Sequence, residues 1–562
     1  MDTLADFCAR LSPLPLPGEM RQWDADAAAF GLTPELLMES AGRAACEVLL
    51  RHRPDVAGAS VWLIMGSGNN GGDAACMARL LADRGARPLL FCARPPESAA
   101  GAAGHHLAMA RANGVPVAPL GELPAAMAAC LGAPGEGAGD AARLAAEYGP
   151  PRVVIDGLLG TGFAGTLRPE AQAAIEQVNA LSRRLADCFV LALDIPSGLD
   201  ATSGRPSPVA VRAHATVSLA AAKPGLVLPE AAPWVGALHV GDIGMPAAVR
   251  GAVAHYLLDG RALSALPAPP AESHKNSFGH VLVLGGAPGL SGAGHLASAA
   301  ALRAGAGRVT AAAPAASVDA IKSGWPEIMT VALGEDNERR WPATVPDALR
   351  PLLSRATALA VGPGMGRGED AAAFLSALLE LPDRPPAVID ADALILLSRQ
   401  PGLFARLGDA DVLTPHPGEA AALLGTDNSA VQADRPAALA ALCDLSPAVV
   451  ILKGAGTLVG RAGAPVFISP YAVPALAMGG SGDVLAGCIA ALLGRRGRPK
   501  DAALCAAATG VALHALAGRL CGRDFPGRGC VASELADALP RVLAGLGEPA
   551  AAVWECRVPW PH

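Results

Sequence analysis

The segment Val61-Trp62-Leu63-Ile64-Met65 runs directly into Gly66-Ser67-Gly68-Asn69-Asn70-Gly71-Gly72-Asp73. A continuous apolar run of this length predicts a buried strand, and we expect a helix over residues 74–84. Strand, glycine-rich loop and helix in this order form the unit of a doubly wound α/β fold, whose ligands bind at the carboxyl ends of the strands. The loop amides and carboxylate suit sugar hydroxyls, phosphate or a hard cation. The alternative is a loop in which Asn and Gly simply accept positive φ.

Two further strands of the first half end in aspartate. Residues 153–155 lead into Asp156, and residues 189–193 lead into Asp194, with Ser197 three residues later. The carboxyl ends of neighbouring parallel strands meet at one edge of a sheet. One carboxylate at a strand end is often structural, but two beside a glycine-rich loop and a serine predict a single shared site.

The second half repeats the strand–loop–helix pattern after the proline-rich stretch Leu266-Pro267-Ala268-Pro269-Pro270, which is typical of a stiff linker. Short apolar runs predict strands over residues 280–284, 308–312, 358–361, 387–389, 412–413 and 449–452. We therefore expect two α/β domains, over residues 1–260 and 273–562, joined by a linker over residues 261–272.

A second decisive stretch is Met478-Gly479-Gly480-Ser481-Gly482-Asp483-Val484-Leu485, followed by an apolar helix over residues 484–493. Glycines let backbone N–H groups approach an anion closely, and a helix start adds unpaired donors and a positive dipole end. Asp483 would then be a carboxylate beside a cradled phosphate, the arrangement needed to move a phosphoryl group onto a hydroxyl. Alternatively, the aspartate is only a helix cap.

Polar residues follow the other strands of the second half. Lys453, between an apolar strand and a glycine pair, is a candidate contact for a nucleotide phosphate, and a solvated surface lysine is the alternative. His416, flanked by prolines, is either a substrate contact, which we favour, or a rigid turn residue. Asp390 and Asp392 are a cation pair or helix caps. Glu419 reaches a hydrated Mg²⁺ or is the first-turn acid of a helix over residues 420–424.

The composition narrows the class of protein. The chain has 562 residues, 52% of them hydrophobic, a net charge of −7 and no Lys/Arg-dense run, so nucleic acid is not an expected partner. Its start lacks the basic and apolar regions of a signal peptide, and the apolar residues 502–521 are interrupted by His514 and Arg519, which favours a buried helix over a membrane span. The 12 cysteines form no CxxC pair, which predicts reduced thiols and a cytoplasmic location; a bridge or metal at Cys521 and Cys530 stays open.

The first half resembles the NAD(P)H-hydrate epimerase domain over about residues 20–249, through Met38-Glu39, residues 69–73, 156–162 and 194–199, and Lys223-Pro224-Gly225. The resemblance implies a potassium ion bound by Asn70, Asp156 and Ser197, and it implies that Asp194 handles the proton at C6 of the hydrated nicotinamide. Ala74 stands where the family usually has glycine, which we expect to be tolerated. The implied substrate-binding residues are Asn69, Asn70, Gly71, Gly72, Asp73, Gly160, Thr161, Gly162, Phe163, Ala164, Gly165, Thr166 and Asp194.

The second half resembles the ribokinase-like NAD(P)H-hydrate dehydratase over about residues 274–543. The matching runs are residues 301–307, 362–366, 390–394, 414–419, 453–457 and 479–483. The resemblance implies ADP as co-substrate with Mg²⁺, and AMP and phosphate as products. His274-Lys275-Asn276 departs from the family, which commonly has glycine third. The implied nucleotide-binding residues are Lys453, Gly454, Ala455, Gly456, Thr457 and Gly482, and the implied hydrate-binding residues are Ala293, Gly364, His416 and Asp483.

Taken together, the residues and the two resemblances predict an N-terminal Rossmann-like domain and a C-terminal ribokinase-like domain in one repair enzyme for hydrated NADH and NADPH. Asp194 and Asp483 are the expected catalytic residues. We also expect a homo-oligomer with no membrane partner. One rival is a ribokinase-like small-molecule kinase that releases a stable phosphorylated product. In that rival the first half is a non-catalytic binding or scaffold domain.

Overall fold

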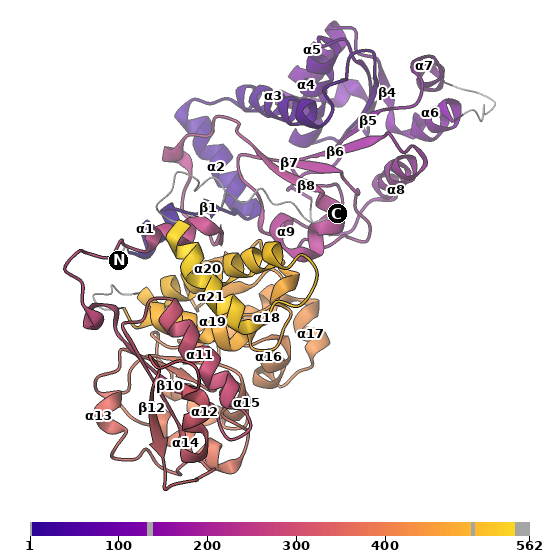
Figure 1. Ribbon diagram of the computed structural model, residues 1–562. Coiled ribbons are helices and arrows are strands. Elements are labelled where there is room, and N and C mark those ends of the chain that lie inside the picture. Colours follow the sequence, from indigo (N-terminus) through magenta and orange to yellow (C-terminus); the bar gives the residue numbers. More distant parts are fainter. Residues whose placement is uncertain (1–2, 132–138, 164, 496–500, 546–562) are drawn as a thin grey trace. The chain divides into compact units, whose positions relative to one another are not determined.

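The computed structural model describes residues 3–131, 139–163, 165–495 and 501–545 (Figure 1). The described residues divide into two compact units. The N-terminal unit lies within Pro13–His255, and the C-terminal unit within Met1–Ser12 and Tyr256–Cys556. The predicted linker and residues 3–12 therefore both lie in the C-terminal unit.

The N-terminal unit is built on a 7-stranded sheet in the order β4-β3-β2-β5-β6-β7-β8. Every neighbouring pair in it is parallel, and the central strands β2, β5 and β6 are buried along nearly their whole length. Parallel pairing brings the carboxyl ends of these strands to one edge. The strands are β2 (Ser60–Met65), β3 (Arg87–Cys92), β4 (Val117–Pro119), β5 (Val153–Gly157), β6 (Phe189–Leu193), β7 (Ala215–Leu219) and β8 (Ala237–Gly241).

Helices cover both faces of this sheet (Figure 1). One apolar cluster joins α6, α7 and α8 to Trp62 and Phe91 of the sheet, while α3, α4 and α5 lie on the opposite face. The longer helices are α2 (Pro17–Phe30), α3 (Pro34–His52), α4 (Asn69–Ala82), α5 (Gly101–Ala112), α6 (Leu123–Cys130), α7 (Asp140–Tyr148) and α8 (Pro169–Arg184). The short ones are η1 (Pro96–Ser98), η2 (Leu120–Glu122), α9 (Pro224–Val227), η3 (Pro229–Ala231), α10 (Ala232–Val235) and η4 (Ala247–Val249).

Helix α4 begins at Asn69, five residues before the predicted start, so the prediction of a loop over residues 69–73 is wrong. The turn is confined to the three residues before it, and the two glycines lie inside the helix. A Cβ at Gly71 would lie 2.1 Å from the carbonyl oxygen of Gly66, and a Cβ at Gly72 would lie 2.4 Å from Met38 Sδ. The glycines therefore allow the first helical turn to pack against the end of β2 and against α3.

The C-terminal unit contains most of an 11-stranded sheet, in the order β1-β9-β18-β17-β16-β15-β14-β13-β10-β11-β12. The pairs from β12 to β16 are parallel, whereas β16, β17 and β18 pair antiparallel. Strands over 280–284, 358–361, 387–389, 412–413 and 449–452 have the bounds that the sequence predicts. The strands are β1 (Ser12–Pro13), β9 (His255–Leu257), β10 (His280–Leu284), β11 (Arg308–Pro314), β12 (Met329–Leu333), β13 (Ala358–Val361), β14 (Ala387–Ile389), β15 (Val412–Leu413), β16 (Val449–Leu452), β17 (Leu458–Gly460) and β18 (Val466–Ile468).

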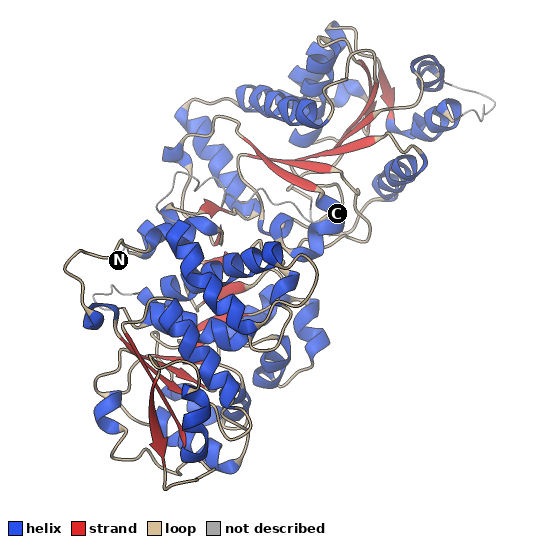
Figure 2. Cartoon of the chain, in the orientation of Figure 1, coloured by secondary structure: helices blue, strands red, loops and turns tan. Residues whose placement is uncertain are grey.

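An apolar cluster of this unit joins Val281, Val283 and neighbouring strands to α11, α19, α20 and α21. Figure 2, in the orientation of Figure 1, shows the helices in blue and the strands in red. The longer helices are α1 (Leu4–Ala9), α11 (Ser291–Arg303), α14 (Glu369–Leu379), α15 (Asp392–Ser398), α16 (Pro417–Leu424), α17 (Asn428–Ala433), α18 (Arg435–Cys443), α19 (Ser481–Leu493), α20 (Ala502–Asp524) and α21 (Ala532–Ala544). The short ones are η5 (Gly260–Ala265), η6 (Lys275–Phe278), η7 (Ala315–Ser317), α12 (Val318–Lys322), α13 (Arg350–Leu353), η8 (Pro401–Arg406) and η9 (Pro474–Leu476).

The N-terminal helix α1 contributes Phe7 and Cys8 to that cluster, and Leu11 joins it just after the helix ends. Phe7 packs edge-to-face on Phe467 of β18, with ring centroids 5.4 Å apart. The predicted linker is likewise ordered structure at its start, because η5 buries Leu263 in the same core.

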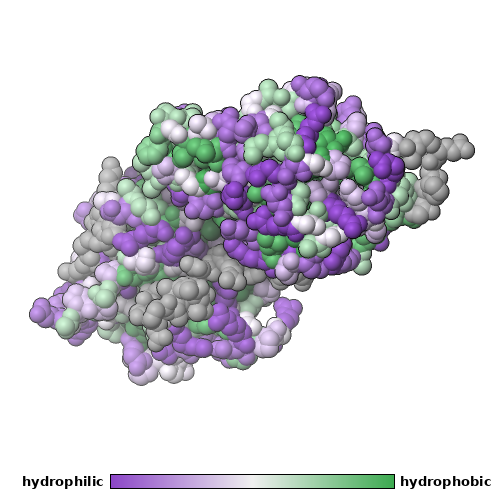
Figure 3. Space-filling view, turned by 90° about the horizontal axis from the view of Figure 1, so that it is seen from above, coloured by the Kyte–Doolittle hydropathy of each residue, from purple (hydrophilic) through white to green (hydrophobic). Residues whose placement is uncertain are grey.

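Helix α20 is the only helix in the described residues that is long and apolar enough to span a bilayer. Inside the structure 83% of its apolar window is buried, as expected for a core helix. On the face shown in Figure 3, hydrophilic residues (purple) alternate with patches of hydrophobic residues (green). Every cysteine among the described residues is a free thiol, so Cys521 and Cys530, whose thiols contact each other, form no disulfide.

Candidate active sites

Asn70, Asp156 and Ser197 converge at the carboxyl edge of the N-terminal sheet. The Ser197 hydroxyl donates to Asp156 Oδ1 at 2.6 Å, and its backbone N–H donates to Oδ2 at 2.8 Å. The Asn70 amide donates to the carbonyls of Leu159 and Leu193 at 2.8 and 3.0 Å. That leaves Asn70 Oδ1 buried without a hydrogen-bond partner. Burial raises the pKa of Asp156 to about 6, and the Ser197 hydrogen bonds oppose this shift. The cluster is thus a buried, oxygen-rich site with one unsatisfied acceptor.

Asp194 follows β6 in a conformation that is unusual for its residue type. Its φ is +60°, in the left-handed region that few non-glycine residues adopt. The strained backbone is fixed by a hydrogen bond from its N–H to the Val217 carbonyl at 2.7 Å. Such strain is concentrated at functional sites, and here it aims the carboxylate at Lys223.

Lys223 is a residue whose role the sequence analysis missed. Its side chain is 1% exposed, and its ammonium pairs with Asp194 Oδ1 and donates to Ser218 Oγ at 3.0 Å and the Leu219 carbonyl at 3.1 Å. The available signal was a lone lysine in the apolar run from 219 to 228. A buried lysine requires a carboxylate partner, and Asp194 supplies it.

Asp73 interacts electrostatically with the ion pair of Asp194 and Lys223. Burial first, and then the Asp194 and Asp24 carboxylates, raise the pKa of Asp73 well above its usual value, while Lys223 opposes the shift. Asp24, on α2, is a second residue that the sequence analysis missed, and no local pattern marks it. The carboxyl edge of the N-terminal sheet therefore holds three carboxylates around the buried Lys223 ammonium. They belong to Asp24, Asp73 and Asp194.

The remaining predicted residues of this edge differ in their surroundings. Gly160 lies against Asn70, because a Cβ there would be 3.2 Å from Asn70 Cβ. Phe163 packs partly against the α6–α8 core. Ala164 lies outside the described residues. The exposed members are Asn69, Gly162, Gly165 and Thr166, the half-buried ones are Gly160, Thr161 and Phe163, and the buried ones are Asn70, Gly71 and Gly72.

Lys453 lies at the centre of the C-terminal site. Its Nζ is 2.7 Å from Asp390 Oδ1 and 3.6 Å from Glu419 Oε2. Burial acts to lower the pKa of Lys453, but Asp390 and Glu419 outweigh it and the net shift is upward. Thr414 Oγ1 also donates to Asp390 Oδ1 at 2.6 Å. The segments that follow β14, β15 and β16 therefore deliver a half-buried cation and two buried carboxylates to one point.

Asp483 lies beside this ion pair in the first turn of α19, which begins at Ser481, three residues before the predicted start. Gly480 caps the helix with φ +90°, and a Cβ there would lie 2.7 Å from Leu296 Cδ1. Burial and the Asp390 carboxylate raise the pKa of Asp483 to about 7, against the opposing charge of Lys453. A carboxylate with this pKa can exchange a proton at neutral pH.

His416 caps α16. Its Nδ1 accepts hydrogen bonds from the backbone N–H groups of Gly418 and Glu419 at 3.0 and 3.2 Å. Its Nε2 lies 3.3 Å from Glu419 Oε1. Glu419 is the first-turn acid of the same helix, and burial raises its pKa to about 7, with Lys453 opposing. His416 therefore has the rigid role at a turn that was one of its two predicted roles. Its side chain is also 55% exposed, so a ligand can reach it.

Two other predicted groups lie on neighbouring loops. Gly364, with φ +57°, touches α11, because a Cβ there would be 2.9 Å from Ala293 Cβ. Asp392 accepts from Gly366 N–H at 2.9 Å and Arg367 Nε at 2.7 Å, and the cation pair with Asp390 stays a prediction.

The predicted nucleotide loop follows β16. Buried Arg435, which the sequence analysis missed, donates to the carbonyls of Leu452, Lys453 and Gly456 at 3.1–3.4 Å. Gly454 and Ala455 are exposed, Thr457 Oγ1 donates to the Gly454 carbonyl at 2.8 Å, and Gly456 is buried. Gly482 adjoins this loop, since a Cβ there would be 3.5 Å from Lys453 Nζ.

Comparison with known proteins gives two family matches. Residues 34–225 match the model described as YjeF-related protein N-terminus, and residues 281–541 match the model for NAD(P)H-hydrate dehydratase. The chain is 38% identical over 541 residues to the bifunctional NAD(P)H-hydrate repair enzyme Nnr of Moorella thermoacetica, covering 94% of this chain and 96% of that protein. It is 31% identical over 554 residues to the Nnr of Escherichia coli, covering 96% and 97%.

Among solved structures, the ADP/ATP-dependent NAD(P)H-hydrate dehydratase of Bacillus subtilis, co-crystallized with ATP/Mg²⁺, aligns with a TM-score of 0.41 at 27% identity, covering 50% of this chain and 95% of that one. The largely parallel sheets with their flanking helices and the two family matches confirm the predicted α/β fold class. The chain belongs to the family of bifunctional NAD(P)H-hydrate repair enzymes.

Proposed function

We propose that this chain restores hydrated NADH and NADPH in two steps. The N-terminal unit interconverts the R and S epimers at the hydrated carbon. The C-terminal unit then phosphorylates the hydroxyl of the S epimer with ADP, releasing AMP, and the phosphate leaves as the nicotinamide double bond returns. The family membership and the site chemistry support this proposal over a kinase with a scaffold domain.

The observation that carries the dehydration step is Asp483 at the start of α19, with its pKa raised to about 7 by burial and Asp390. At neutral pH it is partly ionised, so it can take the proton from the substrate hydroxyl. The unpaired N–H groups of the first helical turn then stabilise negative charge on the transferred phosphoryl group. Phosphorylation turns a poor leaving group into a good one.

Binding in the C-terminal unit follows from the surrounding loops. We assign the nucleotide to residues 453–457 with Gly482, and the hydrate to Ala293, Gly364, His416 and Asp483. The buried Asp390 and Glu419 carboxylates suit a hydrated Mg²⁺, which prefers oxygen ligands and retains water. When bound with ADP, the ion neutralises phosphate charge. Lys453 holds Asp390 in place.

For epimerisation we assign the proton-handling role at C6 to Asp194, whose carboxylate Lys223 orients. The hydrate would lie against residues 69–73 and 160–166. The oxygens of Asn70, Asp156 and Ser197 fit a potassium ion, because Asn70 Oδ1 is buried and unpartnered and a hard cation would satisfy it. The ion would hold the strand ends together and supply positive charge near the substrate.

Absorbance recovery tests the proposal directly. Mixed-epimer NADH hydrate is incubated with the protein and Mg²⁺ under three conditions: with ADP, with ATP and without nucleotide. Complete recovery of NADH with ADP, faster than spontaneous epimerisation, is expected. If NADH recovery stops once the S hydrate is consumed, the dehydratase activity stands and the proposed epimerase activity does not. A stable phosphorylated product instead would favour the small-molecule kinase.

Two coarser expectations accompany this proposal. The free thiols of the described cysteines support a cytoplasmic location, where thiols stay reduced. A homo-oligomer stays a prediction, which light scattering after gel filtration would test.

A further inference from the structure

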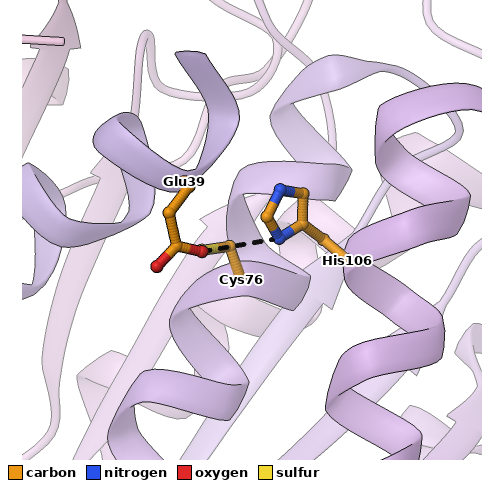
Figure 4. Close-up of side chains that lie close together, drawn as sticks. All are labelled: Glu39, Cys76 and His106. Atoms are coloured by element: carbon orange, nitrogen blue, oxygen red, sulfur yellow. Dashed lines mark hydrogen bonds and ion pairs between the residues drawn. The ribbon is translucent and has the colours of Figure 1, made fainter. Parts of the chain in front are cut away.

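A second cluster of ligand-type side chains lies away from the strand ends, among three helices of the N-terminal unit (Figure 4). Glu39 comes from α3, Cys76 from α4 and His106 from α5. Their ligand atoms all lie within 4.8 Å of one another. Neither proposed reaction uses these residues.

Two of the three distances match those between ligands of one small metal ion. Cys76 Sγ lies 3.4 Å from Glu39 Oε2, and His106 Nδ1 lies 3.8 Å from the same oxygen. In a tetrahedral zinc site with bonds of about 2.0–2.3 Å, ligand atoms are separated by about 3.3–3.8 Å. The third pair, Cys76 Sγ and His106 Nδ1, lies within 4.8 Å, so one ion can bind between the three atoms once these two side chains close any remaining gap.

His106 supplies an independent sign of a ligand. Its side chain is 3% exposed, and its Nε2 lies 3.1 Å from the Glu35 carbonyl, which can only accept. Nε2 therefore carries the proton, and Nδ1 presents a lone pair toward Glu39 and Cys76 (Figure 4). Nδ1 is buried with no hydrogen-bond partner. Leaving a buried acceptor without a partner is unfavourable, and a backbone carbonyl on the other ring nitrogen is the usual support of a metal-ligating histidine.

The donor set selects the metal. Thiolate, imidazole and carboxylate together suit Zn²⁺, whereas Mg²⁺, Ca²⁺ and K⁺ prefer oxygen alone. Cys76 is fully buried, but the Glu39 side chain is 26% exposed, so a water can reach the fourth position from that side. Binding exchanges the thiol proton of Cys76 for the metal, and the proton goes to solvent.

The two arginines around Glu39 can accommodate this change. Arg43 holds Oε1 at 2.7 Å and orients the carboxylate, while Arg79 contacts Oε2 at 2.6 Å. Arg79 also lies 4.0 Å from Asp83 Oδ2, which can receive it when the metal takes Oε2. The helices themselves have little room to move, because a Cβ at Gly42 would lie 2.5 Å from Cys76 Sγ.

We propose that Glu39, Cys76 and His106 form a zinc site that ties α4 to α3 and α5. Helix α4 carries residues 69–73 in its first turn, and Cys76 lies one turn beyond Asp73. A metal at this point therefore stabilises the helix that presents part of the proposed hydrate site. The inference does not depend on the proposed reactions, since it rests on geometry outside the strand ends.

The test uses the full-length protein, stripped with a chelator and titrated with Zn²⁺ and with Co²⁺. Wild type should bind one zinc per chain at this site, melt at a higher temperature with zinc, and show a thiolate-to-cobalt absorption band. Cys76→Ser and His106→Gln should weaken zinc binding at least about tenfold and lose the zinc-dependent rise in melting temperature. Cys188→Ser, at another buried cysteine of the same unit, should behave as wild type.

Partly exposed Glu39→Gln provides a further variant if Cys76→Ser does not fold, and it should also weaken zinc binding. Unchanged zinc affinity and cobalt spectrum in both Glu39→Gln and His106→Gln would overturn the proposal, as would absence of zinc binding by wild type. Loss of the cobalt band in Cys188→Ser but not in Cys76→Ser would assign the metal to another cysteine and would equally overturn it.

Discussion

Lys453 Nζ lies 2.7 Å from Asp390 Oδ1 and neutralises the carboxylate that most strongly repels the charge of Asp483. The three groups come from the ends of two strands and the start of one helix. Their mutual charges hold the pKa of Asp483 near neutrality: burial and Asp390 raise it, and Lys453 lowers it. The proton affinity of the proposed base is therefore set by residues that are far from it in the sequence.

Changing Lys453 to Met should move the pH dependence of dehydration to higher pH. Asp483 works as a base only when deprotonated, so kcat/KM should rise with pH through about 7. Removing Lys453 removes the charge that lowers the pKa of Asp483, and the rising limb should shift up by about one pH unit. Asp390→Asn should shift it down. Profiles of exposed Lys322→Met serve as the control, and a shift of the two site variants in the same direction would contradict the electrostatic account.

Asp483→Asn should abolish ADP-dependent dehydration and leave R-to-S exchange intact. A positioned general base contributes about 10²–10⁴ in rate, and asparagine has nearly the same shape but accepts no proton. Dehydration is measured by absorbance recovery from pure S hydrate, and exchange by chromatography of the two epimers. Near-normal dehydration by this variant would remove Asp483 from the role of base.

The sequence predicts the strands better than the helix starts. The strand over residues 280–284 has the predicted bounds because buried parallel strands are continuous apolar runs. Helix α4 begins five residues early because its first turn is polar and glycine-containing, which looks like a loop until Gly71 and Gly72 are seen to pack against β2 and α3. Tertiary packing overrides local propensity there.

The site residues show the same division. Asp194 and Lys223 are each conspicuous in the sequence, but they are 29 positions apart and only the fold pairs them. Arg435 gives no local signal at all, although it supports the loop after β16. Likewise, nothing in the sequence around Phe7 indicates that it packs on β18, a strand that comes after the entire N-terminal unit in the chain. Motifs therefore predict chemistry, whereas partners at long range need the three-dimensional structure.

Asp194→Asn should abolish epimerisation without changing the backbone, because asparagine adopts the left-handed region as readily as aspartate. Lys223→Met should reduce epimerisation and also destabilise the N-terminal unit by about 3 kcal/mol, since it breaks a largely buried ion pair. The double variant should recover stability but not activity, because it leaves no unpaired buried charge. Urea unfolding and epimer exchange measure the two effects; a double variant less stable than Lys223→Met would refute the pairing argument.

Potassium should stabilise the N-terminal unit more than sodium does. A ligand that binds only the folded state stabilises it by about 2.7 kcal/mol at one hundred times its Kd. Melting curves in KCl and NaCl at equal ionic strength measure the difference. Ser197→Ala removes one proposed ligand and should abolish the potassium-specific part, whereas Ser203→Ala, on the neighbouring loop, should not. Equal melting temperatures in KCl and NaCl would contradict the proposed potassium site.

Phe7→Ala should destabilise the C-terminal unit although it lies at the opposite end of the sequence. Phe7 is 1% exposed and packs on Phe467, so its truncation should cost about 3–5 kcal/mol. On heating, ADP-dependent dehydration should then be lost at a lower temperature than in wild type, while epimerisation should be lost at an unchanged one. Phe30→Ala is the matched control, because Phe30 is 63% exposed and its removal should change stability by about 0.5 kcal/mol or less. Loss of epimerisation before dehydration in Phe7→Ala would show that α1 stabilises the other unit instead.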